Sequence, residues 1–123
     1  MDGGAGGGGA LVLVATPLGN LGDLSPRGRE ALERADVIYC EDTRRTRVLL
    51  SAVGLRAGGR LRALHEHNEA ARAPEVVARV AAGELVALVT DAGTPAISDP
   101  GERAVAAVAA AGLTVTTTPG PSA

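Results

Sequence analysis

Two groups of titratable side chains in this sequence could perform acid–base chemistry. His65 and His67 are the only histidines and flank Glu66, while Asp91 follows an uninterrupted aliphatic run. Histidine titrates near neutral pH without any perturbation, which suits it to removing a proton from a reacting group. His65 and His67 are therefore candidates for a general base, as are Asp23, Glu66 and Asp91.

The same histidine pair could in principle share a metal ion, because alternate residues of a strand point to one side. No third ligand with matching spacing accompanies the pair. The single cysteine, Cys40, excludes an internal disulfide and argues against a thiolate site. We expect no metal, which leaves a general base, an RNA contact or a polar surface as the roles open to His65 and His67.

A one-sided basic segment lies between residues 43 and 64, where arginines occur without any acidic residue. These arginines are Arg44, Arg45, Arg47, Arg56, Arg60 and Arg62. Such a cluster could contact phosphates, and a solvated helix face explains it equally well. The net charge of −2 gives no overall attraction to nucleic acid or membranes.

Residues 90–101 combine two prolines, two glycines and two aspartates. Proline fixes φ and glycine permits positive φ, so the backbone path of such a loop is restricted and its main-chain groups can point at a ligand. Asp99 is expected to cap a helix that begins at Pro100. Asp91 has no comparable structural task, and the stretch therefore predicts a binding loop.

Five apolar segments are expected to form strands, and the segments between them helices. The expected strands are residues 10–15, 36–40, 62–64, 85–89 and 113–117; the expected helices are 26–35, 44–53, 74–83 and 100–111, with Ser25 and Thr43 as caps of the first two. This alternation predicts an α/β domain with a five-stranded, mostly parallel sheet and helices on both faces. Ligands bind at the carboxyl ends of such strands, where the polar loops of this chain converge.

The termini add expectations about domain organisation. Residues 1–9 form a glycine-rich leader that should be disordered and lacks the features of a signal peptide. Residues 10–123 should form one domain, and no apolar run approaches the roughly 20 residues that span a bilayer. The single cysteine favours a cytoplasmic location. The chain stops where Ser122 would cap a further helix, which indicates a cut domain boundary. Neither a dinucleotide fingerprint nor a P-loop occurs.

Five ordered motifs resemble the ribosomal RNA small subunit methyltransferase I family, within the tetrapyrrole methylase superfamily of class III S-adenosylmethionine-dependent methyltransferases. They are Val-Ala-Thr-Pro-Leu-Gly-Asn-Leu-Gly-Asp (14–23), Cys-Glu-Asp-Thr-Arg-Arg-Thr (40–46), His-Glu-His-Asn-Glu (65–69), Thr-Asp-Ala-Gly-Thr-Pro-Ala-Ile-Ser-Asp-Pro-Gly (90–101) and Pro-Gly-Pro-Ser-Ala (119–123). The resemblance implies 2′-O-methylation of a cytidine ribose in the decoding region of 16S rRNA in the small ribosomal subunit. It also implies a homodimer, and S-adenosylmethionine held between two domains, of which the second is absent here.

The resemblance assigns cofactor contacts to three loops. These are Pro17, Leu18 and Gly19 in the first, Asp91, Gly93, Thr94, Pro95, Ile97 and Ser98 in the second, and Ser122 and Ala123 in the third. Thr90 stands where serine is commoner in the family.

The RNA contacts are expected from arginine rather than from aromatic stacking, because Tyr39 is the only aromatic residue. They are assigned to Arg44, Arg45, Arg47, Arg60 and Arg62. Two alternatives stay open: a precorrin or uroporphyrinogen methylase, which shares the fold and cofactor, and an isolated non-catalytic half of an enzyme.

Overall fold

The computed structural model describes residues 8–16, 24–91 and 101–118. The described strands are β1 (Ala10–Thr16), β2 (Val37–Cys40), β3 (Leu61–Ala63), β4 (Leu85–Asp91) and β5 (Val115–Thr118), and the helices are α2 (Pro26–Arg34), α3 (Thr43–Ala52), α4 (Glu69–Ala81) and α5 (Glu102–Ala110). The strands form one sheet in which each described pair is parallel. The predicted α/β fold is confirmed, with a sheet that is parallel throughout rather than mostly so.

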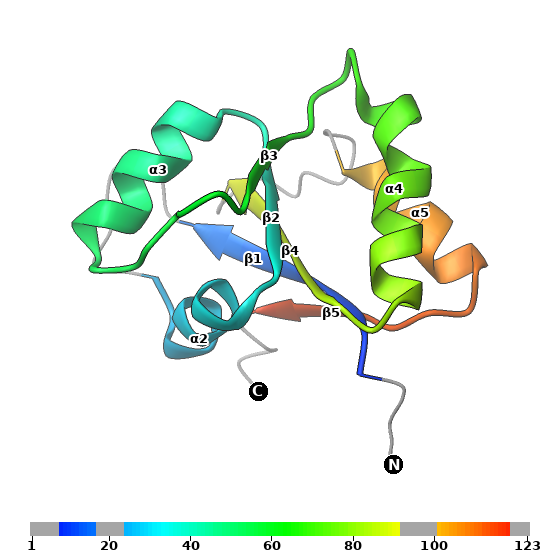
Figure 1. Ribbon diagram of the computed structural model, residues 1–123, viewed down its shortest axis with the longest axis horizontal. Helices are drawn as coiled ribbons and strands as arrows, with labels where there is room; N and C mark the ends of the chain where they lie inside the picture. Colours follow the sequence, from blue (N-terminus) through cyan, green and yellow to red (C-terminus); the bar gives the residue numbers. More distant parts are fainter. Residues whose placement is uncertain (1–7, 17–23, 92–100, 119–123) are drawn as a thin grey trace.

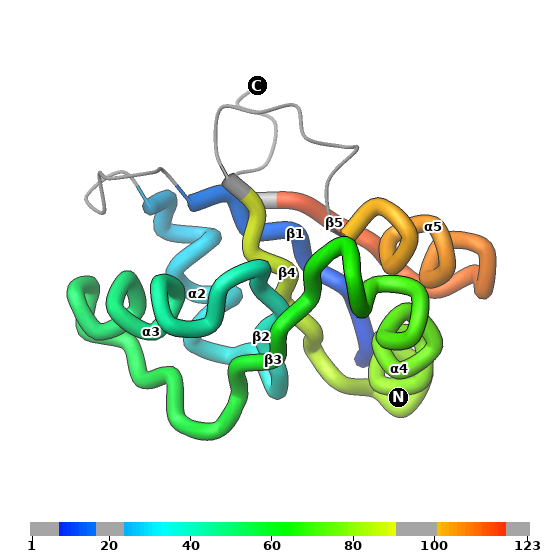
Figure 2. The backbone as a smooth tube through the Cα atoms, turned by 90° about the horizontal axis from the view of Figure 1, so that it is seen from above, coloured from blue at the N-terminus to red at the C-terminus, as the bar shows by residue number. Residues whose placement is uncertain are grey.

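The strand order β3-β2-β4-β1-β5 shows that the chain reverses direction across the sheet. It runs from β1 through β2 to the β3 edge, and then returns through β4 to β5. Because parallel crossovers are right-handed, this reversal moves the connecting helices to the opposite face. Figures 1 and 2 show α2 and α3 on one side of the strands and α4 and α5 on the other.

The sheet separates two hydrophobic clusters, one under each pair of helices. Leu32 of α2 lies in the first cluster and Val108 of α5 in the second, and both are fully buried. Successive residues of β1 enter different clusters, Val12 the first and Leu11 the second. The uninterrupted aliphatic run of this strand is therefore explained by burial on both faces.

Helix α4 begins at Glu69, so the predicted start at Pro74 is wrong. The turn before the helix supplies its first bonds, because the amides of Asn68 and Glu69 both donate to the His65 carbonyl. Pro74 therefore lies inside the helix, where it has no amide with which to donate to the carbonyl four residues earlier. The prediction followed from the preference of proline for the first helical position.

The predicted caps of two other helices also differ from those observed. Asp42, and not Thr43, caps α3, since its Oδ1 accepts a hydrogen bond from the Arg45 amide at 3.1 Å. Helix α5 begins at Glu102 rather than Pro100, and Gly101 with φ of 116° stands at its N-cap. The predicted cap Asp99 lies outside the described residues. Ser25 caps α2 as predicted, with its Oγ 2.9 Å from the Gly28 amide.

Alkaline pH should destabilise the domain through Tyr39. Burial, together with a hydrogen bond from its hydroxyl to Glu75, raises the pKa of Tyr39 to about 12. A raised folded-state pKa gives a contribution that is complete below the unfolded value near pH 10 and is lost as pH rises through the folded value. We expect the free energy of unfolding to fall by about 2–3 kcal/mol from this group over that interval.

Denaturant unfolding of the chain and of Tyr39→Phe at a series of alkaline pH values measures this loss. No lysine titrates in the interval, because the 12 basic side chains are all arginine. Burial also raises the pKa of the Cys40 thiol, so Cys40→Ala serves as the background for both proteins. An unchanged pH slope in Tyr39→Phe would show that the phenol is not responsible.

Candidate functional site

The ends of β1 and β4 form the point at which the chain leaves the sheet toward opposite faces. The two strands pair up to Thr16 and Asp91, and from there β1 leads to α2 on one face while β4 leads to α5 on the other. A crevice at such a switch point is the usual ligand position in open parallel sheets. The topology therefore identifies this part of the carboxyl edge as the candidate site.

The side chains of two threonines form hydrogen bonds between these strand ends. The Thr16 hydroxyl donates to the Thr90 carbonyl at 3.2 Å, and the Thr90 hydroxyl donates to the Val14 carbonyl at 3.5 Å. Thr16 is only 4% exposed. These side-chain bonds supplement the strand ladder and fix the separation of the points at which the two segments leave the sheet. Their role was not predicted, since a threonine in a strand usually signals only β propensity.

The predicted cofactor-binding residues follow three neighbouring strands, β4, β1 and β5. The structure describes the ends of these strands at Asp91, Thr16 and Thr118. Of the predicted residues, Asp91 closes β4 through its backbone pairing with Thr16. The candidate base Asp23 lies outside the described residues. So do the other predicted cofactor-binding residues, which are Pro17, Leu18, Gly19, Gly93, Thr94, Pro95, Ile97, Ser98, Ser122 and Ala123.

The two histidines lie on a turn at the carboxyl end of β3. Asn68 organises this turn, because its Oδ1 accepts from the His65 amide at 2.9 Å and its Nδ2 donates to the Ala63 carbonyl at 3.1 Å. The His67 amide donates to Nδ1 of His65 at 3.2 Å. A neutral His65 thus carries its proton on Nε2, so neither ring nitrogen has a free lone pair.

His67 is the more open of the two histidines. Its side chain is 84% exposed, its ring lies 5.7 Å from that of His65 between centroids, and its Nε2 is 4.0 Å from the Glu66 carboxylate. Among the described residues, no group of three His, Cys, Asp or Glu side chains could hold a metal ion. The arrangement favours His67 over His65 as a proton acceptor.

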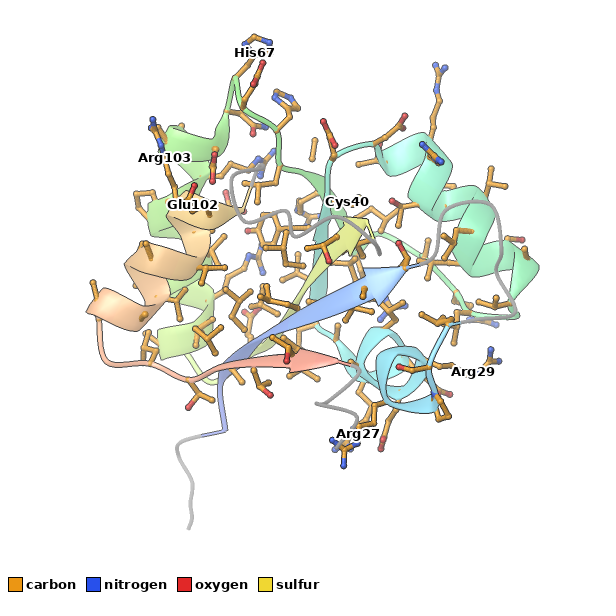
Figure 3. The ribbon with its side chains drawn as sticks, turned by 180° about the vertical axis from the view of Figure 1, so that it is seen from behind. Arg27, Arg29, Cys40, His67, Glu102 and Arg103 are labelled. Carbon is orange, nitrogen blue, oxygen red and sulfur yellow. The ribbon has the colours of Figure 1, made fainter. Side chains whose placement is uncertain are left out.

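Glu69, directly after this turn, reaches the start of α5. Its Oε2 accepts hydrogen bonds from the amides of Gly101 at 2.8 Å and Arg103 at 2.7 Å. Figure 3 places Arg103 and Glu102 at the beginning of α5, on the same side of the molecule as His67. The sequence gives no local signal of this contact, because it predicts Asp99 as the cap of this helix.

The predicted RNA-contacting arginines fall into two groups. Arg44 and Arg45 are exposed in the first turn of α3, directly beyond the carboxyl end of β2. Arg60 and Arg62 instead donate to backbone carbonyls near the amino end of β3, Arg62 to Gly59 at 2.7 Å. Arg47 lies between these groups, and its Nη1 is 3.4 Å from the Gly58 carbonyl.

Arg60 closes the carboxyl end of α2. Its Nη1 donates to the carbonyls of Leu32 at 2.7 Å and Ala35 at 2.9 Å, which satisfies acceptors that the helix end leaves free. We expect Arg60→Ala to lower the free energy of unfolding by about 1–3 kcal/mol. Chemical denaturation measures the change, with the exposed Arg56→Ala as control. Equal free energies of unfolding for the two variants would contradict the role of Arg60 as a cap of α2.

The comparison with protein families decides the class of the domain. The model of tetrapyrrole (corrin/porphyrin) methylases matches residues 10–123. The chain belongs to this family. Within residues 8–16, 24–91 and 101–118 of this methylase domain, no helix has the length and apolar character needed to cross a membrane.

Curated relatives of this methylase domain are named ribosomal RNA small subunit methyltransferase I. The protein of that name from Xylella fastidiosa is 54% identical over 115 residues, which are 94% of this chain and 41% of the relative. The one from Mesorhizobium japonicum is 50% identical and the one from Escherichia coli O157:H7 47%, with 93% and 94% of this chain covered. The chain therefore spans about two fifths of the length of these relatives.

Solved structures share the fold of this methylase domain. The uroporphyrin-III-C-methyltransferase of Thermus thermophilus superimposes with a TM-score of 0.65 at 22% identity, over 91% of this chain and 47% of that one. A diphthine synthase gives 0.64 at 20% identity, over 88% and 43%. At these identities the likeness supports the fold alone.

Proposed function

We propose that this methylase domain supplies one wall of the S-adenosylmethionine site of an enzyme that methylates ribosomal RNA. The reaction is transfer of a methyl group to the 2′-hydroxyl of a cytidine in 16S rRNA of the small ribosomal subunit. The observation that carries the proposal is the switch point between β1 and β4, where two of the motifs shared with the family adjoin. The identity of 54% to a protein named ribosomal RNA small subunit methyltransferase I supports ribosomal RNA as the substrate class.

The residues at the carboxyl edge suit S-adenosylmethionine better than a dinucleotide. In dinucleotide-binding folds the pyrophosphate lies on a free helix N-terminus. Here the first amides of α5 already donate to the Glu69 carboxylate, which neutralises the positive end of that helix. Bound S-adenosylmethionine supplies an electrophilic methyl group on a positively charged sulfur, and a neutralised helix end does not repel such a cation.

Three loops of this chain would hold the cofactor. They are the segments of Pro17, Leu18 and Gly19 after β1, of Asp91, Gly93, Thr94, Pro95, Ile97 and Ser98 after β4, and of Ser122 and Ala123 after β5. Their restricted backbones, rich in proline and glycine, suit recognition through main-chain groups. The opposite wall would come from sequence that this chain does not contain.

Proton removal from the ribose hydroxyl is the chemical task left to side chains. His67 is the best-placed base among the described residues, because His65 already accepts a bond at Nδ1. Glu66 lies in the same turn and Asp91 ends β4, while Asp23 lies outside the described residues. Correct orientation of the hydroxyl would add to the rate independently of any base.

The RNA would be held by Arg44 and Arg45 at the start of α3, with Arg47 one turn further on. Cations in the first turn of a helix oppose its dipole, so these positions cost stability and favour a functional role. Arg60 and Arg62 would contribute less, since their side chains are engaged with carbonyls. A ribosomal substrate also implies a cytoplasmic protein, and we propose that the enzyme is a homodimer.

Two competing functions rest on particular observations. The family description, corrin and porphyrin methylases, favours a tetrapyrrole substrate. The coverage of about two fifths of each curated relative favours a domain without activity of its own.

Methylation of small ribosomal subunits with radiolabelled S-adenosylmethionine tests the proposal. The assay compares this chain alone with a chimera in which residues 10–123 replace the matching part of the Xylella fastidiosa relative. We expect label in 16S rRNA with the chimera, at a cytidine whose 3′ phosphodiester resists alkali because its 2′-oxygen is methylated. Transfer to uroporphyrinogen instead of RNA would establish the tetrapyrrole alternative, and a chimera inactive on both would contradict the proposed function.

A further inference from the structure

Glu69 joins two helices at the carboxyl edge of the sheet through a buried carboxylate. It is the first residue of α4 and only 8% exposed, and its Oε2 accepts the amides of Gly101 and Arg103. Gly101 occupies the N-cap position of α5 and has no side chain with which to cap it. The first turn of α5 is thus capped by a residue of another helix.

The position of Glu69 is itself fixed by the turn that carries the histidines. The Glu69 amide donates to the His65 carbonyl at 2.8 Å, and Asn68 ties the same turn to the end of β3. Residue Glu69 is therefore tied through its backbone to the turn that carries His65 and Asn68.

Gly101 also packs closely against a side chain of β4. A Cβ atom on this residue would lie 2.7 Å from Cδ2 of Leu88, and its φ of 116° is one that other residues rarely adopt. In the sequence, the predicted cofactor-binding residues 91–98 come between two points that the structure describes, the end of β4 and Gly101. Glu69 is the only described side chain that hydrogen-bonds to the second of these points.

We propose that Glu69 is a positioning residue for the cofactor-binding segment. Its carboxylate fixes the place at which that segment meets α5, and holds this place in register with the turn of His65 and His67. The inference rests on the proposed function, because it assigns the segment after β4 to the cofactor. Removing the carboxylate should loosen the anchor and weaken cofactor binding without disturbing the core.

Two substitutions separate positioning from general stability. Glu69→Gln keeps the size of the side chain and one acceptor oxygen but loses the charge, whereas Glu69→Ala loses both. Charge-assisted bonds are roughly twice as strong as neutral ones, so we expect affinity for S-adenosylmethionine to fall about 5-fold in the first and about 30-fold in the second. Partial rescue by glutamine distinguishes the loss of these hydrogen bonds from a general defect.

Glu84→Gln is the matched control. Glu84 accepts a hydrogen bond from Arg79 at 3.0 Å beyond the other end of α4, at the amino edge of the sheet. Nuclear magnetic resonance of the 123-residue chain reports three quantities for each protein: the amide signals of residues 91–98, the exchange of the Gly101 and Arg103 amides, and binding of millimolar S-adenosylmethionine. Thermal unfolding provides the comparison of stability.

We expect both Glu69 variants to shift the signals of residues 91–98 and to weaken binding, while Glu84→Gln does neither at a similar loss of stability. Faster exchange at Gly101 and Arg103 with unchanged binding and unchanged signals of 91–98 would overturn the inference, leaving a helix cap only. If Glu69→Ala fails to fold, the same measurements on Glu69→Gln alone test the positioning role. If the unsubstituted chain does not bind the cofactor, the proposed function fails, and the signals of 91–98 in Glu69→Gln still decide the positioning role.

Discussion

Replacing Gly101 by alanine should lower the free energy of unfolding by about 2–4 kcal/mol. Two effects add at this residue. Its φ of 116° disfavours any side chain, and the new Cβ would lie 2.7 Å from Cδ2 of the buried Leu88. Relief of that overlap would require Leu88 to move within a packed cluster under α4 and α5. Chemical denaturation of the 123-residue chain measures the change.

Gly112→Ala is the control for the steric part of this effect. Gly112 follows the same helix with φ of 77°, but nothing lies within 4 Å of a Cβ built on it. We therefore expect Gly112→Ala to lower the free energy of unfolding only through its backbone conformation, by about 1–2 kcal/mol. Equal losses at the two glycines would show that the overlap with Leu88 is not limiting and that the start of α5 can shift to relieve it.

Reversing the charges of Arg44 and Arg45 together to glutamate should weaken RNA binding by about 10- to 100-fold at moderate salt. Both side chains are exposed beside the carboxyl edge. Fewer counterions are released on binding when fewer phosphates are neutralised, so the slope of log affinity against log salt should fall by about 1.4–1.8, the contribution of two phosphates. Filter binding or fluorescence anisotropy with a 16S rRNA fragment measures both quantities.

The matched control reverses Arg34 and Arg56, which changes the net charge equally at the opposite edge of the sheet. Arg34 ends α2, and Arg56 lies in the loop before β3. If both double reversals weaken binding equally, the RNA is attracted by overall charge and has no defined contact at the start of α3. If neither changes binding, these arginines do not form the RNA surface.

The sheet was predictable chiefly because two of its interior strands, β1 and β4, are nearly pure aliphatic runs. Residues 11–15 and 85–89 leave no polar face, which only a two-sided sheet can bury. The convergence of the polar loops on one edge followed from parallel strand direction alone. The strand order, and with it the switch point between β1 and β4, required the structure, since the sequence does not state which strands are neighbours.

Contacts between elements distant in sequence were the part that could not be predicted. Glu69 and Gly101 are 32 residues apart, and no local pattern connects a carboxylate in one turn with an uncapped helix start in another. The sequence places Arg60 among the RNA-contacting arginines, because spacing alone cannot show that its guanidinium donates to the carbonyls at the end of α2. The true start of α4 has no side-chain signal in the sequence, because the bonds that begin this helix at His65 are made by the backbone.

Mapping the binding of S-adenosylmethionine onto the amide signals of this chain tests the central claim most directly. With one wall of the site present, we expect weak binding, seen at millimolar concentration as shifts at Thr16, Thr90 and Gly101. The amino edge, represented by Arg60 and Gly83, should stay unchanged. Shifts confined to the amino edge, or no shift at any residue, would contradict the assignment of the cofactor to the switch point between β1 and β4.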